Sequence, residues 1–163
     1  MFLERKSRPA PPQTLADCGR LNTELLRLQD PLFTLAWLLV GSEAVAEKAV
    51  DLACQEACAH ASAAGSQAFC EQLYICLVRA CRGGLGFASP PSGKASRAVK
   101  SADPAVCFAS LPFDTRAALA LVDRERFSYA QAARILGCSE QQVLTRLAAG
   151  RRAFAGLLEE KPS

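Results

Sequence analysis

Apolar residues recur at spacings of three and four through much of the chain, which is the pattern of amphipathic helices. The first stripe lies between Leu15 and Val40 and is divided by Pro31. Proline fits the first turn of a helix and Asp30 suits the N-cap before it, so we expect one helix to end near residue 30 and a second to begin there. The stripe consists of Leu21, Leu25, Leu28, Leu32, Leu35 and Leu39.

Two more helices are predicted before residue 82. Ser42 follows Gly41 and can cap a helix that runs to about residue 62. The expected packing face of this helix is narrow and made of small side chains: Ala46, Ala49, Val50, Ala53, Cys54 and Ala57. Another helix is expected from about Gln67 to Cys81, with an apolar face of Phe69, Leu73, Cys76, Leu77 and Ala80.

Composition divides the chain into segments. Residues 83–110 are rich in Gly, Pro and Ser, which predicts a flexible linker, and residues 1–14 are Pro-rich and charged, which predicts a flexible arm. Half of the 163 residues are hydrophobic and only 7% are aromatic, and Ala and Leu dominate the apolar part. This composition favours helix over strand. We therefore predict an all-α protein with two small helical domains, residues 15–82 and 111–163.

The C-terminal domain has the more specific pattern. Ser128 with Gln131, and Ser139 with Gln142, each have the spacing of a capping box, and Gly137 lies between them where a helix ends in a left-handed residue. A short helix ending at Leu136 and a longer one from Glu140 to about Leu158, joined by a tight turn, make a helix-turn-helix. Its expected core is Ala132, Ala133, Ile135, Leu136, Val143 and Leu147. The alternative interpretation is a plain helical hairpin within a bundle.

An earlier helix of this domain is expected to begin at Asp114, as its N-cap, and to continue to about Arg124. Its inward side chains would be Ala117, Ala118, Leu121 and Val122.

In a helix-turn-helix, the first turns of the second helix enter the DNA major groove. Gln can bond adenine, Arg can bond guanine, and Thr can reach a phosphate or a thymine methyl group. Later arginines suit phosphates. The candidate DNA-binding residues are Glu140, Gln141, Gln142, Thr145, Arg146, Arg151 and Arg152.

The segment LPFDTRAALALVDRERFSYAQAARILGCSEQQVLTRLAAGRRAF resembles the fourth region of extracytoplasmic-function sigma factors of bacterial RNA polymerase. The residues that carry the resemblance are Leu111-Pro112, Arg116, Ser128-Tyr129, Ala133, Leu136-Gly137 and the string Val143-Leu144-Thr145-Arg146-Leu147. The resemblance implies a factor that binds core RNA polymerase and reads a −35-type promoter element in double-stranded DNA. It also implies an anti-sigma protein as a further candidate partner.

Residues 31–57 are similar, more faintly, to the second region of the same family. The resemblance implies polymerase binding by Glu47, Lys48 and Asp51. Lys48 and Asp51 replace residues that are usually Asp and Gln in the family, and the segment 57–67 lacks aromatic residues and Lys or Arg. Opening of a duplex needs aromatic side chains and cations. The alternative function is therefore a sigma-like accessory or decoy protein that does not open promoters.

Eight cysteines allow a second kind of chemistry. Most lie among apolar residues at helical spacing, where Cys behaves as a small core residue, and we expect no cofactor. The competing hypothesis is a zinc or redox sensor built on Cys54, Cys58 and His60, with Cys76 or Cys81 completing the ligand set.

Other classes of protein fit poorly. The chain has one His and no HExxH, GxSxG or Gly-rich phosphate loop, so an enzyme is not expected. The longest apolar run is far shorter than the ~20 residues of a membrane span, and the N-terminal segment has charges where a signal peptide is apolar. The net charge of +3, with its excess in the second half, is weak evidence for nucleic acid. A cytoplasmic protein without membrane contact is expected.

Overall fold

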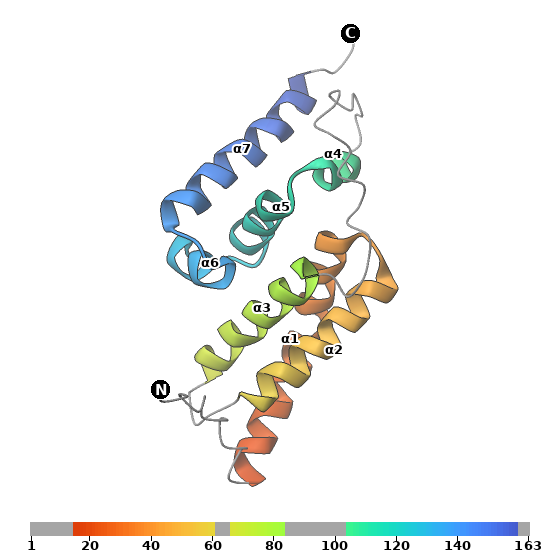
Figure 1. Ribbon diagram of the computed structural model, residues 1–163, viewed down its shortest axis with the longest axis vertical. Coiled ribbons are helices and arrows are strands. Elements are labelled where there is room, and N and C mark those ends of the chain that lie inside the picture. The colour runs from red at the N-terminus through yellow and green to blue at the C-terminus, as the bar shows by residue number, and fades with distance from the viewer. Residues whose placement is uncertain (1–14, 61–65, 84–103, 160–163) are drawn as a thin grey trace, which may run out of the picture.

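The computed structural model describes residues 15–60, 66–83 and 104–159, and these residues contain helices and no strands (Figure 1). The expected arm at 1–14 and most of the expected linker lie outside the described residues. The helical elements are α1 (Leu15–Val40), α2 (Glu43–Ala59), α3 (Ser66–Arg82), α4 (Pro104–Ser110), α5 (Phe113–Leu119), the π-helical turn η1 (Ala120–Arg124), α6 (Tyr129–Leu136) and α7 (Glu140–Glu159). The all-α prediction is confirmed.

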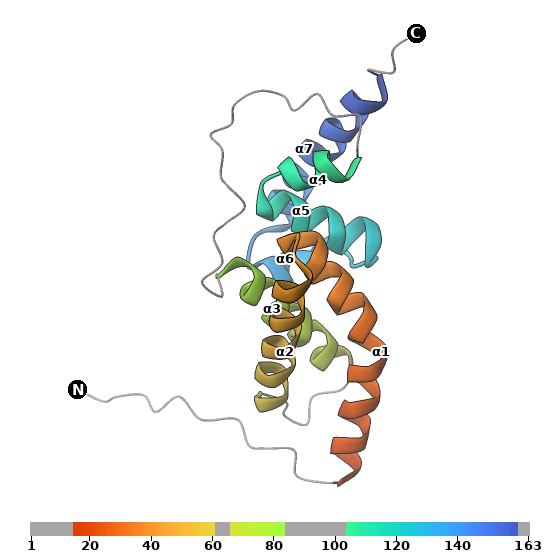
Figure 2. The same ribbon diagram turned by 90° about the vertical axis from the view of Figure 1, so that its right-hand side faces the viewer.

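Helices α1, α2 and α3 pack side by side as an N-terminal unit (Figures 1 and 2). The predicted small-residue face of α2 is its buried face, and four of its alanines are completely inaccessible: Ala46, Ala49, Ala53 and Ala57. Small side chains let α2 approach its neighbours closely, and leucines of α1 and α3 fill the remaining space. The fully buried leucines of these two helices are Leu32, Leu35, Leu39, Leu73 and Leu77.

The predicted break at Pro31 is wrong, because α1 continues through this residue. Leu28 before the proline and Leu32 after it are both buried on the same stripe, so packing on either side favours one continuous helix. This packing opposes the roughly 3 kcal/mol that proline costs inside a helix. Asp30 is therefore a helical residue and not an N-cap, and its carbonyl accepts a hydrogen bond from Thr34 Oγ1 at 2.8 Å.

The C-terminal unit consists of α5, η1, α6 and α7, and helix α4 packs against α7. Two predictions need correction here. The last seven residues of the expected linker form α4, whose Phe108 ring lies beside the Phe154 ring of α7, so part of that segment is packed. Pro112, and not Asp114, occupies the N-cap of α5. Asp114 lies in the first turn, where its carboxylate binds arginines instead.

The two units contact each other directly through α3 and α6. Arg134 of α6 donates to both carboxylate oxygens of Glu71 on α3, at 2.6 and 2.9 Å. Tyr74 of α3 donates to Glu125 at 3.0 Å, and its ring meets Phe127 edge-on with centroids 4.8 Å apart.

A buried arginine ties α5 to two helix ends. Arg116 is 5% exposed and donates to the carbonyl of Leu39 at 2.9 Å and to that of Ala109 at 2.8 Å. Leu39 lies in the last turn of α1 and Ala109 in the last turn of α4, where carbonyl groups lack helical partners and carry partial negative charge. Burial lowers the pKa of Arg116, and these carbonyls stabilise its charge without a carboxylate.

Candidate DNA-binding helix-turn-helix

Local hydrogen bonds fix both ends of α6 and the start of α7. Ser128 Oγ accepts from the backbone N–H of Gln131 and the Gln131 side chain accepts from the backbone N–H of Ser128, which completes the predicted capping box of α6. Ser139 and Gln142 make the same exchange at the start of α7, at 3.0 and 3.2 Å. Gly137 ends α6 in the left-handed region at φ 65°, as predicted. Near neighbours in the sequence therefore define both ends of α6 and the start of α7.

An apolar core fixes the angle between the two helices. All six predicted core residues are buried: Ala132, Ala133, Ile135, Leu136, Val143 and Leu147. Gly150 extends this packing further along α7, because a Cβ atom there would lie 2.5 Å from Leu119 Cδ1 and 3.1 Å from Thr115 Cγ2. The glycine lets α7 approach α5 closely.

The first turns of α7 expose the side chains that sequence analysis assigned to base reading. Glu140, Gln141 and Thr145 are all exposed. Thr145 Oγ1 donates to the carbonyl of Gln141 at 2.9 Å, within the helix. Gln142 is exposed too, but its side-chain oxygen is engaged in the capping box with Ser139. Glu140 and Gln141 are therefore the exposed side chains at the start of α7, and Gln142 caps the helix there.

Arg146 is held by groups on the protein. Its guanidinium donates to Asp114 Oδ2 at 3.0 Å and to Cys138 Sγ at 3.2 Å, and the side chain is 23% exposed. The other oxygen of Asp114 binds Arg82 of α3 at 2.6 Å. One carboxylate thus joins a candidate base-reading arginine to the N-terminal unit. Asp114 was missed as a member of the site, because nothing in the sequence relates positions 82, 114 and 146.

The two arginines further along α7 differ in their surroundings. Arg151 makes two hydrogen bonds to the carboxylate of Asp123, the shorter at 2.5 Å, and this contact raises the pKa of the arginine. Arg152 donates through Nε to the carbonyl of Ala148 at 3.2 Å and is exposed. Arg151 therefore binds a carboxylate, whereas the Nε group of Arg152 binds a backbone carbonyl.

The candidate polymerase-binding residues share one exposed face of α2. Glu47, Lys48 and Asp51 are all exposed, whereas Ala46 before them and Ala49 among them are buried. The structure places the three side chains together, on the side of α2 turned away from the core.

The candidate metal ligands are not brought into a coordination site. Among the described residues, no three His, Cys, Asp or Glu side chains gather in a way that could hold a metal ion. The ring nitrogen Nδ1 of His60 lies 2.7 Å from the carbonyl of Glu56. Burial raises the pKa of the Cys54 and Cys58 thiols and raises that of Cys81 to about 12, which disfavours reactive thiolates.

Comparison with known families gives a match in the C-terminal half. Residues 105–154 match the family described as Sigma-70, region 4. The C-terminal region carries a sigma-70 region 4 helix-turn-helix domain. The match covers α5, α6 and most of both α4 and α7. It indicates a DNA-binding regulator of transcription that is similar to sigma factors, rather than a typical enzyme. It also begins within α4, in agreement with the packing of that helix against α7.

Two further observations complete the comparison. A search of curated proteins found no match to the chain. Within the described part of the chain, none of the helices has the length and apolar character needed to cross a bilayer.

Proposed function

We propose that the protein is a sigma-like initiation regulator of the extracytoplasmic-function type, which binds core RNA polymerase and a −35-type promoter element in the bacterial cytoplasm. The observation that carries the proposal is the sigma-70 region 4 match over a helix-turn-helix whose reading helix α7 exposes Glu140 and Gln141 at its first turn. Recognition helices of this motif read base edges with their N-terminal residues.

The proposed DNA contacts divide by chemistry. Gln141 has the amide that bonds adenine in a bidentate way, and Thr145 offers a methyl group for thymine. Arg152 suits a phosphate, because its position further along α7 lies beyond the turns that enter the groove. Arg146 can contact a base only after it leaves Asp114, since its guanidinium hydrogen-bonds that carboxylate.

Fluorescence anisotropy of the full chain on promoter duplexes tests these assignments. Gln141→Ala is expected to weaken binding to the preferred duplex by about 1–3 kcal/mol and to relax the preference at one base pair. Arg152→Ala should weaken binding to all duplexes alike and reduce the salt slope by about 1. Gln55→Ala is the matched control, because this exposed glutamine lies on α2. Equal affinities for all four proteins would reject the assignments.

The polymerase-binding part of the proposal rests on the face of α2 formed by Glu47, Lys48 and Asp51. It is tested by capture of bacterial core RNA polymerase, followed by run-off transcription from the duplexes that bind. Capture with transcripts supports a working sigma factor. The triple alanine variant should lose capture but keep DNA binding, since the α7 residues are intact.

The accessory or decoy role is the second candidate, and a specific contact favours it. Helix α3 packs against α6 through Arg134 and Glu71, so the N-terminal unit holds the DNA-reading unit in a docked arrangement. Capture of polymerase without transcripts from any bound duplex would favour this role. Absence of polymerase capture would contradict both roles at the polymerase and would favour binding to an anti-sigma partner.

A further inference from the structure

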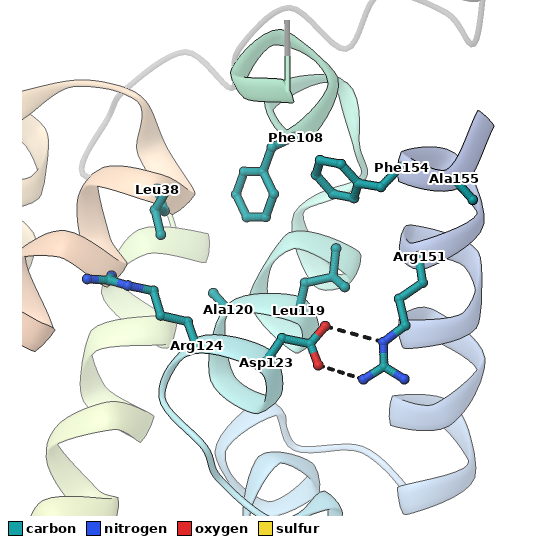
Figure 3. A pocket seen from close by; sticks show the side chains of 9 residues that line it. All are labelled: Leu38, Phe108, Leu119, Ala120, Asp123, Arg124, Arg151, Phe154 and Ala155. Atoms are coloured by element: carbon teal, nitrogen blue, oxygen red, sulfur yellow. Dashed lines mark hydrogen bonds and ion pairs between the residues drawn. The ribbon is translucent and has the colours of Figure 1, made fainter. Parts of the chain in front are cut away.

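A cavity lies at the junction of the two units, at the opposite end of α5–η1 from the helix-turn-helix turn (Figure 3). Its walls come from four separate parts of the chain: Leu38 of α1, Phe108 of α4, Leu119 of α5 and Phe154 of α7. Figure 3 shows these side chains facing a common space, with Ala120 beneath them. The cavity is therefore shaped by both units.

The cavity has the size and lining of a small-molecule site. Its volume is about 560 Å³, within the roughly 300–1,000 Å³ typical of ligand pockets. The rings of Phe108 and Phe154 lie 6.3 Å apart between centroids and tilt by 36°, so they form an aromatic wall on one side. Sites of this kind bind apolar bodies and occur preferentially between domains.

Three charged side chains line this cavity, and Figure 3 shows them on two sides of it. Asp123 and Arg151 are paired with each other at 2.5 Å. Arg124 lies on the other side of the cavity, toward α1, and within the described part of the chain its carboxylate contact is a long one, 3.6 Å to Glu125. The carboxylate of Glu125 also accepts the Tyr74 hydroxyl. Arg151 is neutralised by Asp123, whereas Arg124 has no close carboxylate among the described residues, so Arg124 favours an anionic group over a cationic one.

We propose that this cavity binds a small amphipathic anion, whose aliphatic or aromatic body lies between Leu38 and the two phenylalanines and whose carboxylate lies beside Arg124. Burial of the apolar body supplies most of the binding, and Arg124 supplies the preference for negative charge. Because the ligand contacts α1 and α7 at once, its binding stabilises the docked arrangement of the two units. The site is distinct from the DNA-reading turns of α7 and does not depend on the proposed function.

Isothermal titration of the full chain with octanoate, and with 1-octanol as the uncharged partner of equal chain length, tests the proposal. We expect saturable binding of octanoate at one site, with 1-octanol bound about tenfold more weakly because it lacks the charge-assisted contact with Arg124. Octanoate should also raise the thermal midpoint of unfolding. Absence of saturable octanoate binding would overturn the proposal.

Three variants locate the site. Ala155 lines the cavity from an exposed position on α7, so Ala155→Trp fills the space with little risk to folding. It should weaken octanoate binding about tenfold or more, since the indole takes the place of the ligand's contacts. Ala44→Trp, at an exposed position of α2, is the matched control and should bind as the unmodified chain does.

The third variant tests the role of Arg124. Arg124→Gln should remove the preference for octanoate over 1-octanol while 1-octanol binding is retained. Unchanged octanoate binding in folded Ala155→Trp, checked by circular dichroism, would contradict the location. An unchanged preference in Arg124→Gln would contradict the assignment of the carboxylate to Arg124.

Discussion

The two units of this protein obtain their helix boundaries in different ways. In the C-terminal unit, two capping boxes and a left-handed glycine fix both ends of α6 and the start of α7 by hydrogen bonds between near neighbours in the sequence. In the N-terminal unit, Ser42 has the extended backbone of an N-cap but its side chain makes no capping hydrogen bond, and α1 continues through Pro31. Local chemistry defines the DNA-reading unit, and packing of leucines on alanines defines the other.

A core truncation in the N-terminal unit should have the largest effect. Leu73 is completely buried in α3, so Leu73→Ala is expected to lower the free energy of unfolding by about 2–5 kcal/mol through lost burial and a cavity. Leu26→Ala is the matched control, because Leu26 is 65% exposed on α1. Urea unfolding followed by circular dichroism measures both. Similar losses in the two variants would contradict the description of the N-terminal unit as held by its core.

A pair of glycines on α7 tests packing inside the C-terminal unit. Gly150→Ala places a methyl group against Leu119 and Thr115 and should cost about 1–3 kcal/mol through overpacking. Gly156→Ala meets no atom within 4 Å and should stabilise the protein by about 0.5–1 kcal/mol through helix propensity. Thermal unfolding distinguishes opposite signs. A stabilising Gly150→Ala would mean that α7 does not need close approach to α5.

Ser139 and Ser42 distinguish a helix start with a capping hydrogen bond from one without it. Ser139→Ala removes a capping hydrogen bond of 3.2 Å to the Gln142 backbone and should cost about 1 kcal/mol. Ser42→Ala removes no such bond and should cost no more than a few tenths of a kcal/mol. The difference between the two free energies of unfolding is the quantity to measure. Equal costs would contradict the distinction between locally capped and packed helix ends.

The contact between Glu71 and Arg134 should have the smallest effect, and it should depend on pH and salt. Arg134 lowers the pKa of Glu71 below its ordinary value of 4.5 in the folded chain. Because the folded pKa is the lower of the two, the contact stabilises the protein fully above the ordinary pKa of glutamate. This stabilisation is lost as the pH falls through the folded pKa. Arg134 is 57% exposed and Glu71 18% exposed, so salt should screen part of the effect.

A double-mutant cycle of Glu71→Gln and Arg134→Gln measures that contact. The coupling should be present at pH 7 in low salt, should fall as the pH is lowered through the folded pKa of Glu71, and should shrink in 1 M salt. Coupling that is unchanged both by acid and by 1 M salt would show that the pair is joined by something other than charge.

Sequence reasoning succeeded where structure is set locally. The capping boxes, Gly137 and all six core residues of the helix-turn-helix were predicted, because each depends on neighbours within a few positions. The buried faces of α2 and α3 followed from periodicity in the same way. The break at Pro31 was predicted wrongly, because local preference for a helix start at proline was overridden by packing on both sides.

The candidate site was predictable only in part. Positions 140, 141 and 145 are exposed on α7, as helical geometry requires. The sequence did not predict three ion pairs at this site: Arg146 with Asp114, Arg82 with Asp114, and Arg151 with Asp123. These ion pairs join residues 28 or 32 positions apart, and no spacing rule relates side chains over such distances.

The central claim is that the protein reads duplex DNA through the exposed first turns of α7. Selection of bound duplexes from a random pool, done in parallel with the unmodified chain and with Gln141→Ala, tests it most directly. We expect one enriched motif for the unmodified chain and a changed preference at a single position for the variant. No enriched motif, or the same motif from both proteins, would contradict it.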